Sequence, residues 1–193
     1  MTKIVLASSS PRRKDILSMY NIEPIIVKPN IQERIDFGQS PEQIAMALSF
    51  EKASHVANKF NNGEIIVSAD TVVSCDGIIL GKPKDEVQGV EMIQLLNNKE
   101  HEVITGICII KANSNLKIVD YEKTIVKFRN LTHDKIERYI KTNEYADKAG
   151  GYGIQGYGGL LVEYIKGCYF NVVGFPISKF DYLLEKYFNI SLL

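Results

Sequence analysis

The sequence lacks an excess of charge of either sign, because 23 lysines and arginines are balanced by 23 aspartates and glutamates. Such a chain has no overall electric field that would attract nucleic acid or an anionic membrane. We therefore expect neither of these as a partner, and any anion site has to be built locally. The 193 residues are enough for one large domain, or for one domain with two lobes.

Cysteine is scarce as well. Cys75, Cys108 and Cys168 are odd in number, far apart and without a C-x-x-C pair, which argues against a disulfide framework or a zinc site and fits a reducing compartment. Long apolar runs are missing near the N-terminus, where residues 4–7 are followed by three serines. That run is too short for a signal peptide or a membrane span, so we expect a cytoplasmic protein.

The clearest strand in the sequence begins with three branched apolar residues, Ile65, Ile66 and Val67, and leads to Asp70. Such a run predicts a strand that is buried on both faces of a sheet. A carboxylate at the end of a buried strand is costly, and in open α/β sheets ligands bind at the carboxyl ends of the strands. Asp70 is therefore a candidate site residue. The alternative is that Asp70 only caps the next turn.

A second strand, residues 4–7, runs through a serine-rich turn into a helix. Ser10 suits the N-cap and Pro11 the first helical position. Arg12 and Arg13 then lie in the first turn, where the helix dipole disfavours cations unless an anion sits between them. The turn is therefore a candidate anion site, with a solvated basic turn as the alternative.

The rest of the chain alternates helix and strand patterns. We expect helices over residues 41–60, 85–97, 132–140 and 177–188, and strands over 24–27, 78–80, 101–111, 116–129, 160–165 and 171–176. Asp76-Gly77 marks a hairpin, and Gly106 marks a bulge or a close approach of other backbone. Together these patterns predict an α/β fold with a mixed β-sheet flanked by helices.

Two glycine motifs are rejected as nucleotide sites. Gly77 to Lys82 is one residue short of a P-loop and is followed by proline. Gly151, Gly153 and Gly156 form a G-x-G-x-x-G, but a helix precedes them and a strand follows, which is the reverse of the dinucleotide fingerprint. We interpret this segment as a loop whose glycines let other groups approach the backbone closely, and which carries Lys148 and the amide of Gln155. Lys82, at the exit of the hairpin, is placed to reach back toward Asp70.

Histidines are scattered at His55, His101 and His133, which gives little support to a Ser-His-Asp or Cys-His arrangement. Carboxylates mixed with cations instead suit hydrolysis of a phosphate ester or anhydride, in which cations bind phosphates while carboxylates hold a divalent metal and orient a water. The candidate cations are Arg12, Arg13, Lys52, Lys82 and Lys148, and the candidate carboxylates are Glu33, Asp70 and Asp36. Nothing local distinguishes Glu33, and Lys52 taken alone reads as a surface lysine.

Several blocks, spread over almost the whole chain and in the right order, resemble the Maf family. The blocks are residues 6–13 (LASSSPRR), 68–73 (SADTVV), 81–83 (GKP), 103–106 (VITG), 148–156 (KAGGYGIQG) and 171–176 (NVVGFP). The resemblance implies one Maf-like domain over residues 1–193, with the elongated, two-lobed fold and central cleft of inosine triphosphate pyrophosphatases. It also implies a homodimer and hydrolysis of a nucleoside triphosphate to the monophosphate and pyrophosphate, with Mg²⁺ or Mn²⁺.

The resemblance also implies roles for individual residues. Asp70 corresponds to the acid that activates water, and Glu33 to its partner at the metal. The phosphate-binding set corresponds to Ser8, Arg13, Lys52 and Lys82.

The block containing Gln155 resembles the dTTP/UTP branch of the family, in which Arg12, Thr71 and Gln155 are associated with substrate choice. A glutamine amide carries a donor and an acceptor, which suits the imide edge of uracil or thymine. The alternative is a non-catalytic nucleotide-binding regulator of septum formation. The presence of both Glu33 and Asp70 argues for chemistry, because a pure phosphate binder has no use for two acids beside the anion.

Overall fold

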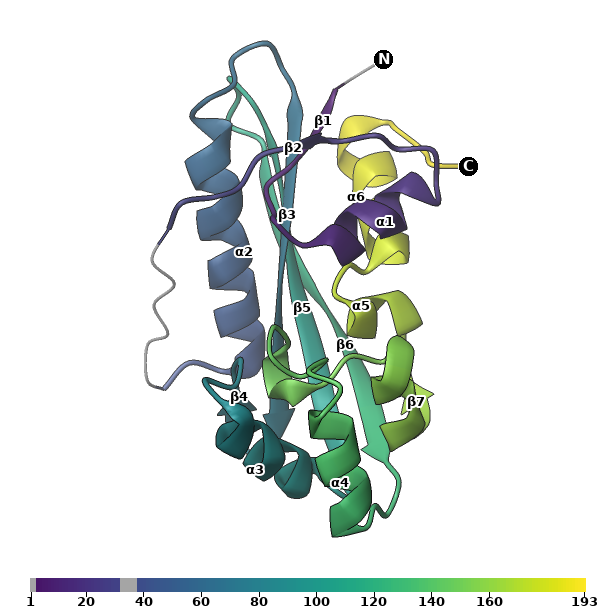
Figure 1. The fold of residues 1–193 in the computed structure, drawn as a ribbon. Coiled ribbons are helices and arrows are strands. Elements are labelled where there is room, and N and C mark those ends of the chain that lie inside the picture. The colour runs from purple at the N-terminus through teal and green to yellow at the C-terminus, as the bar shows by residue number, and fades with distance from the viewer. Residues whose placement is uncertain (1–2, 32–37) are drawn as a thin grey trace. The chain divides into compact units, whose positions relative to one another are not determined.

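The computed structural model describes residues 3–31 and 38–193 (Figure 1). The chain divides into two compact units. Unit 1 comprises residues 1–70, 105–122 and 174–193, and unit 2 comprises residues 71–104 and 123–173. Within the described residues, no helix has the length and apolar character needed to cross a membrane.

A mixed seven-stranded sheet contributes strands to both units, in the order β2-β1-β3-β5-β6-β7, with β4 paired to β3. Its strands are β1 (Ile4–Leu6), β2 (Ile25–Ile26), β3 (Ile65–Cys75), β4 (Ile78–Leu80), β5 (Glu100–Lys111), β6 (Lys117–Phe128) and β7 (Val162–Lys166). The strand β1 runs parallel to β2 and β3, whereas β4 and β7 run antiparallel to β3 and β6. The prediction of a mixed α/β fold is therefore confirmed.

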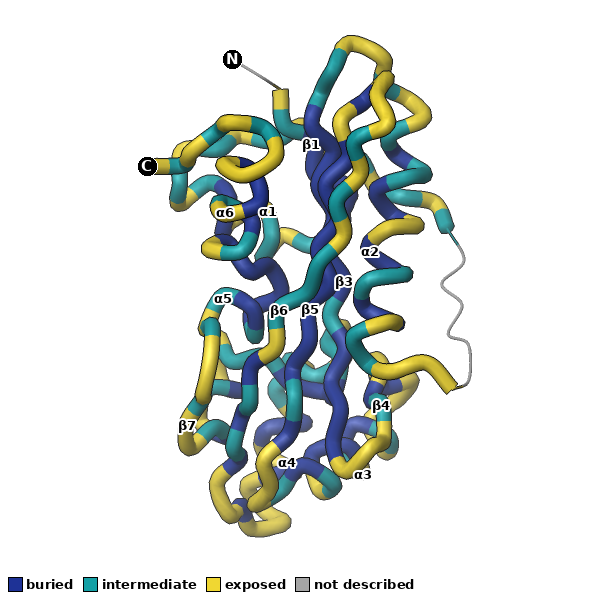
Figure 2. The backbone as a smooth tube through the Cα atoms, turned by 180° about the vertical axis from the view of Figure 1, so that it is seen from behind, coloured by how far each residue is buried: buried dark blue, intermediate teal, exposed yellow. Residues whose placement is uncertain are grey.

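Unit 1 contains the helices α1 (Pro11–Ser18), α2 (Pro41–Ala57) and α6 (Ile177–Phe188). The helix α2 lies on one side of the strands, and α1 and α6 lie on the other (Figures 1 and 2). Gly106 explains how α2 comes so close to β5, because a Cβ there would lie 2.1 Å from the carbonyl oxygen of Ala45. The close approach predicted at this glycine is confirmed.

The start of α2 is fixed by the predicted capping box. The Ser40 hydroxyl accepts a hydrogen bond from the Gln43 amide (3.3 Å), and the Gln43 side chain accepts one from the Ser40 amide (2.9 Å). These two bonds satisfy backbone donors that the first turn of a helix leaves without partners. The helix ends at Ala57, three residues before the predicted end.

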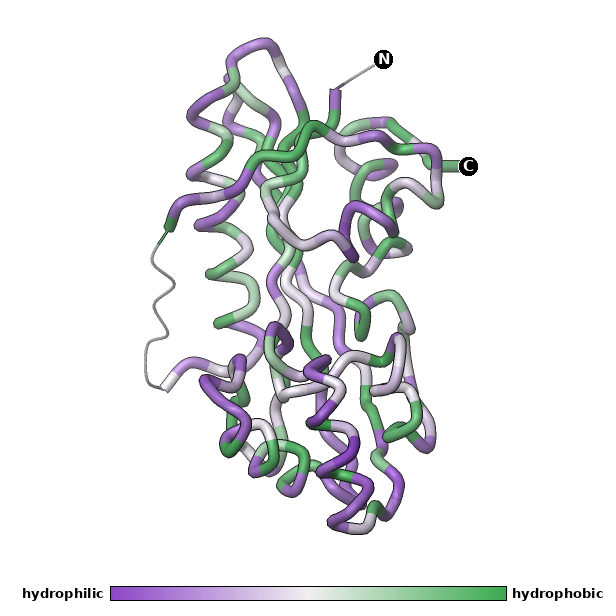
Figure 3. The backbone as a smooth tube through the Cα atoms, in the orientation of Figure 1, coloured by the Kyte–Doolittle hydropathy of each residue, from purple (hydrophilic) through white to green (hydrophobic). Residues whose placement is uncertain are grey.

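The core of unit 1 is formed by small and branched side chains from β1, β3, β5 and α2. The buried members are Val5, Ala7, Ala53, Val56, Ile66, Cys108, Ile110 and Ala112. The hydrophobic colouring of β1 (Figure 3) follows this packing, whereas the two isoleucines of β2 are exposed. The strand β3 is buried along almost its whole length (Figure 2). Burial on both faces of β3 is the property that its apolar run predicted.

Unit 2 contains α3 (Glu86–Leu96), α4 (His133–Ile140) and α5 (Tyr169–Val173), with the short 3₁₀ helices η1 (Ala149–Gly151) and η2 (Gly156–Leu161). Side chains of Asp85 and Thr132 cap α3 and α4 by accepting bonds from backbone amides, at 2.8 and 3.4 Å. The core of this unit combines aliphatic residues of α3, α4 and the strands with Phe128, Tyr139 and Tyr152.

Two sequence-based assignments in unit 2 are wrong. Residues 171–176 were expected to end a strand, but residues 171–173 form the last part of the helix α5. The Asn171 amide donates to the Val103 carbonyl (2.9 Å) and to the Thr124 hydroxyl (3.0 Å), and these bonds fix a buried helical turn there. Short apolar runs do not distinguish a buried strand from a buried helix. The strand expected from residue 160 begins at Val162, because η2 occupies the preceding residues.

Candidate functional site

The turn between β1 and α1 forms an ordered polar corner around Ser8. The nearly buried Ser8 hydroxyl accepts a hydrogen bond from the Ser10 amide (3.1 Å) and another from Nη1 of Arg13 (3.2 Å). Arg13 also donates from Nε to the Gly174 carbonyl (2.8 Å). Ser10 occupies the predicted N-cap position, but its side chain makes no capping bond. The guanidinium is thus held in one orientation at the start of a helix, as binding of an anion requires.

The register of the sheet places this corner near the part of β3 that carries Asp70. Leu6 of β1 pairs with Val67 of the parallel strand β3, and the Ala7 amide donates to the Val67 carbonyl (2.8 Å). Ser8 and Asp70 follow these paired residues in the same chain direction. The side chains therefore come from neighbouring strands of unit 1.

Asp70 lies within β3, 8% exposed, and accepts a hydrogen bond from the ammonium group of Lys52 in α2. The contact follows from two periodicities. Ser68 and Asp70 share a face of the strand, while Ser49 and Lys52 share a face of the helix. The Ser68 hydroxyl bonds to the Ser49 carbonyl, and this bond aligns the strand with the helix so that the acid and the amine meet.

Two expectations about this pair are wrong. Asp70 does not end its strand, because β3 continues through apolar residues to Cys75. Lys52 is not a surface lysine, since it is 9% exposed and paired. A signal for its burial was present in the sequence: Ile44, Leu48 and Lys52 are spaced four residues apart and lie on one buried face of α2.

Four predicted residues, Thr71, Lys82, Lys148 and Gln155, belong to unit 2. Lys82 is exposed after β4, and the Gly150 amide donates to the adjacent Gly81 carbonyl (3.0 Å). Thr71 is half-buried in β3. The structure therefore joins the turn that carries Lys82 to the glycine-rich segment that follows Lys148.

The loop carrying Gln155 is tightly wound and is held by a residue that the sequence did not reveal. Gln155 is exposed at the N-cap of η2. The carboxylate of Glu144 accepts hydrogen bonds from the Tyr157 and Gly158 amides, both at 3.2 Å. At Gly156, with φ of +63°, an added Cβ would lie 2.5 Å from this carboxylate. Glycine is thus required where the acid approaches the backbone.

Lys148 is anchored beside the same loop. Its ammonium group donates to the Glu144 carbonyl (2.5 Å) and to the Asp147 carboxylate (2.6 Å). The aliphatic part of the side chain packs against Gly153, where a Cβ would lie 2.8 Å from it. Lys148 therefore supports the loop, and its predicted contact with substrate stays a prediction.

The predicted metal ligand Glu33, together with Asp36, lies outside the described residues. Among residues 3–31 and 38–193, no cluster of three or more His, Cys, Asp or Glu side chains is arranged to hold a metal ion. The described groups of unit 1 still combine an oriented arginine and serine with a carboxylate paired to lysine. This set is able to bind a polyanion and to accept a proton from water.

Comparisons with known proteins agree with the resemblance seen in the sequence. A family model described as Maf-like protein matches residues 3–187. The chain is 51% identical to the dTTP/UTP pyrophosphatase of Clostridioides difficile (strain 630), over 98% of this chain and 97% of that protein. It is 46% identical to the dTTP/UTP pyrophosphatase of Ruminiclostridium cellulolyticum, over 96% of each.

Among solved structures, the Staphylococcus aureus Ham1 protein is similar over 84% of this chain and 81% of its own, with 14% identity and a TM-score of 0.48. The family match covers nearly every described element of both units. The chain belongs to the Maf family.

Proposed function

We propose that this chain is a nucleoside triphosphate pyrophosphatase that hydrolyses dTTP and UTP to the monophosphate and pyrophosphate. The observation that carries the proposal is the near-complete match, at 51% and 46% identity, to two proteins named dTTP/UTP pyrophosphatase. Matches of this extent leave no large insertion or deletion in which a different site would be built.

The polar groups of unit 1 support a role in binding and cleaving the triphosphate. We assign Ser8 and Arg13 to the phosphates, because the Gly174 carbonyl already orients the guanidinium and less ordering is needed when substrate binds. Asp70 is the proton acceptor for the attacking water. Lys52 keeps the carboxylate in place and provides positive charge beside the reacting phosphate.

A divalent metal fits the donor chemistry of this set. Mg²⁺ usually takes one or two protein carboxylates together with phosphate oxygens of the substrate, and Asp70 supplies a carboxylate of that kind. We therefore propose that Asp70, with Glu33 as its predicted partner, holds Mg²⁺ or Mn²⁺. When bound, such a cation neutralises charge on the phosphate oxygens.

The loop of unit 2 supports a role in choosing the base. Gln155 is exposed, while Glu144 fixes the backbone next to it. A fixed backbone with an exposed amide is suited to reading the donor and acceptor pattern of a pyrimidine. We assign Gln155 to the imide edge of uracil or thymine, and Arg12 and Thr71 to substrate choice with it.

Release of pyrophosphate over a panel of nucleoside triphosphates, with and without Mg²⁺ or Mn²⁺, tests the proposal. We expect turnover of dTTP and UTP well above that of purine nucleotides, and none after chelation of the metal. Binding of nucleotides without turnover would contradict the assignment and favour a regulator. In Gln155→Ala, the ratio of the rates on dTTP or UTP to the rates on other nucleotides should fall, while the rate on poor substrates changes less. Equal losses of rate on all bases would remove Gln155 from this role.

A further inference from the structure

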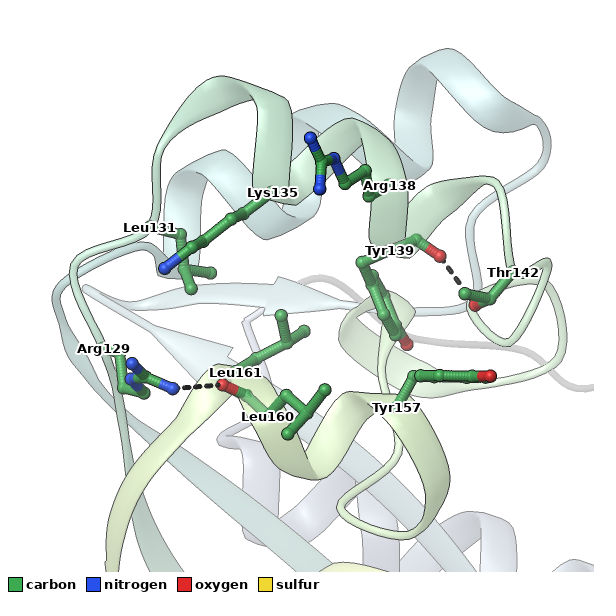
Figure 4. Close-up of a pocket in the computed structure, with 9 residues that line it drawn as sticks. All are labelled: Arg129, Leu131, Lys135, Arg138, Tyr139, Thr142, Tyr157, Leu160 and Leu161. Atoms are coloured by element: carbon green, nitrogen blue, oxygen red, sulfur yellow. Dashed lines mark hydrogen bonds between the residues drawn. The ribbon is translucent and has the colours of Figure 1, made fainter.

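Unit 2 contains a cavity of about 340 Å³ that none of the predicted site residues lines. It lies between α4, the end of β6 and η2 (Figure 4). The volume falls within the range of ~300–1,000 Å³ that is typical of small-ligand pockets. The cavity is therefore large enough for one small organic molecule.

The floor of the cavity is apolar. Leu131 and Leu161 are 7% and 3% exposed, whereas Leu160 and Tyr157 at the edge are 64% and 60% exposed. Large apolar side chains exposed together around a hollow are typical of a surface that a ligand covers. The apolar part of the occupant would rest on these leucines.

One end of the cavity is positively charged. Arg129 and Lys135 extend toward the same side of it (Figure 4), and Arg129 is held by a bond to the Leu160 carbonyl (3.3 Å). Among the described residues, neither of these two cations forms an ion pair, whereas Arg138 on the same helix pairs with Asp134 at 3.0 Å. Two positive charges that are not ion-paired favour an anionic group at this end.

The opposite end is aromatic. The rings of Tyr139 and Tyr157 border the cavity there (Figure 4). The Tyr139 hydroxyl donates to the Gly151 carbonyl (3.2 Å), and burial raises the pKa of this phenol, so the group stays neutral. A planar ring is the chemical group that packs best against two aromatic side chains.

We propose that this cavity is a second nucleotide site, which binds a nucleoside monophosphate with its phosphate between Arg129 and Lys135 and its base against Tyr139 and Tyr157. The apolar floor suits the base better than it suits a triphosphate, and two cations match the charge of one phosphate group. The ligand is of the class that the proposed reaction releases.

The cavity is also connected to the loop that carries Gln155. Tyr157 and Leu160 belong to η2, which begins directly after Gln155, and Tyr139 bonds to the glycine-rich segment before it. A ligand that binds more tightly to one position of η2 will change the affinity of the chain for substrate. Substrate will then change the affinity for the ligand by the same factor. This coupling, unlike the binding itself, rests on the proposed role of Gln155.

Isothermal titration of the full chain with UMP tests the site. We expect two binding events per chain in the wild type. The variant R129Q/K135Q should weaken one event by about tenfold or more, because it removes both charged contacts to the phosphate. The matched control K84Q/K141Q removes the same charge from two exposed positions of unit 2 that do not line the cavity, and it should keep both events. Uridine and inorganic phosphate, which each lack one half of the ligand, should bind this site weakly.

Other results would overturn the proposal. Binding of UMP by R129Q/K135Q that equals wild-type binding excludes the cavity, as does a single wild-type event that is lost only in Arg13→Gln. A lower molecular mass of R129Q/K135Q in light scattering would make this face an interface between copies. Tyr157→Ala, at an exposed position, serves if the double variant does not fold, and it should weaken the same event. None of these readouts depends on turnover, so a failure of the proposed hydrolysis is seen separately.

Discussion

Asp70 in unit 1 and Gln155 in unit 2 have the most specific proposed roles, and the structure holds them in different ways. Asp70 is inside a strand and is bonded to a lysine from the helix packed on that strand. Gln155 is exposed on a loop whose backbone is fixed by Glu144. The comparison indicates that the proposed chemistry depends on packed secondary structure. The proposed choice of base depends on a loop, which is able to vary without disturbing a core.

The largest effect is expected from Asp70→Asn, which tests the chemical side of the comparison. Turnover of UTP should fall by about a thousandfold, because an amide accepts no proton from water, while nucleotide binding measured by titration survives. Asp76→Asn is a matched control at an exposed position with φ of +51°, a conformation that asparagine tolerates well. Full activity of Asp70→Asn would exclude Asp70 from the mechanism.

The next effect concerns the stability of the same pair. Lys52→Met leaves the Asp70 carboxylate buried without its cation, which should lower the free energy of unfolding by about 3 kcal/mol. The double variant Lys52→Met/Asp70→Asn removes both charges and should recover part of that loss. Urea denaturation measures both, with Lys59→Met as the exposed control. If the single variant is as stable as wild type, the pair is not a buried interaction in solution.

A buried histidine gives unit 2 a different response to acid. His101 is 2% exposed, with Nε2 lying 2.7 Å from the Tyr152 hydroxyl, and burial lowers its pKa to about 4. The unfolded chain therefore binds the proton more readily, and stability is lost as the pH falls through 6.5 toward 4. We expect the histidine to account for a loss of about 2 kcal/mol between pH 7 and pH 5.

Urea denaturation at several pH values tests this expectation. In His101→Gln, stability should depend less on pH in this range, whatever its absolute value. The exposed His133 provides the control for loss of an imidazole, and the change in pH dependence should be larger in His101→Gln than in His133→Gln. An identical acid dependence in His101→Gln and wild type would contradict the role of burial.

The smallest effect is expected in the loop. Glu144→Ala removes the acceptor for two backbone amides, so the loop should lose its fixed position and the preference for UTP over CTP should fall about tenfold, equivalent to about 1.4 kcal/mol. The rate on CTP should change little. Glu137→Ala, on the exposed side of α4, is the control. Equal losses on both nucleotides would show that Glu144 supports the fold rather than the choice of base.

Much of the fold follows from local patterns. The capping box at Ser40, the Asp76-Gly77 hairpin and the close approach at Gly106 were all predicted from the sequence and are confirmed by the structure. The capping box and the hairpin depend on residues near one another in the chain, whose backbone preferences are strong. The helix α6 has the predicted bounds for the same reason. At Gly106 the signal is the glycine itself, whereas its neighbour Ala45 lies far away in the sequence.

The sequence by itself determined the types of group available for chemistry and, through the family blocks, which residues to consider. Only the tertiary structure decided that Lys52 meets Asp70 and that Glu144 holds the loop of Gln155. Periodicity tells which side chains share a face of a helix or strand. It does not tell which face lies opposite, because that depends on packing between segments far apart in the chain.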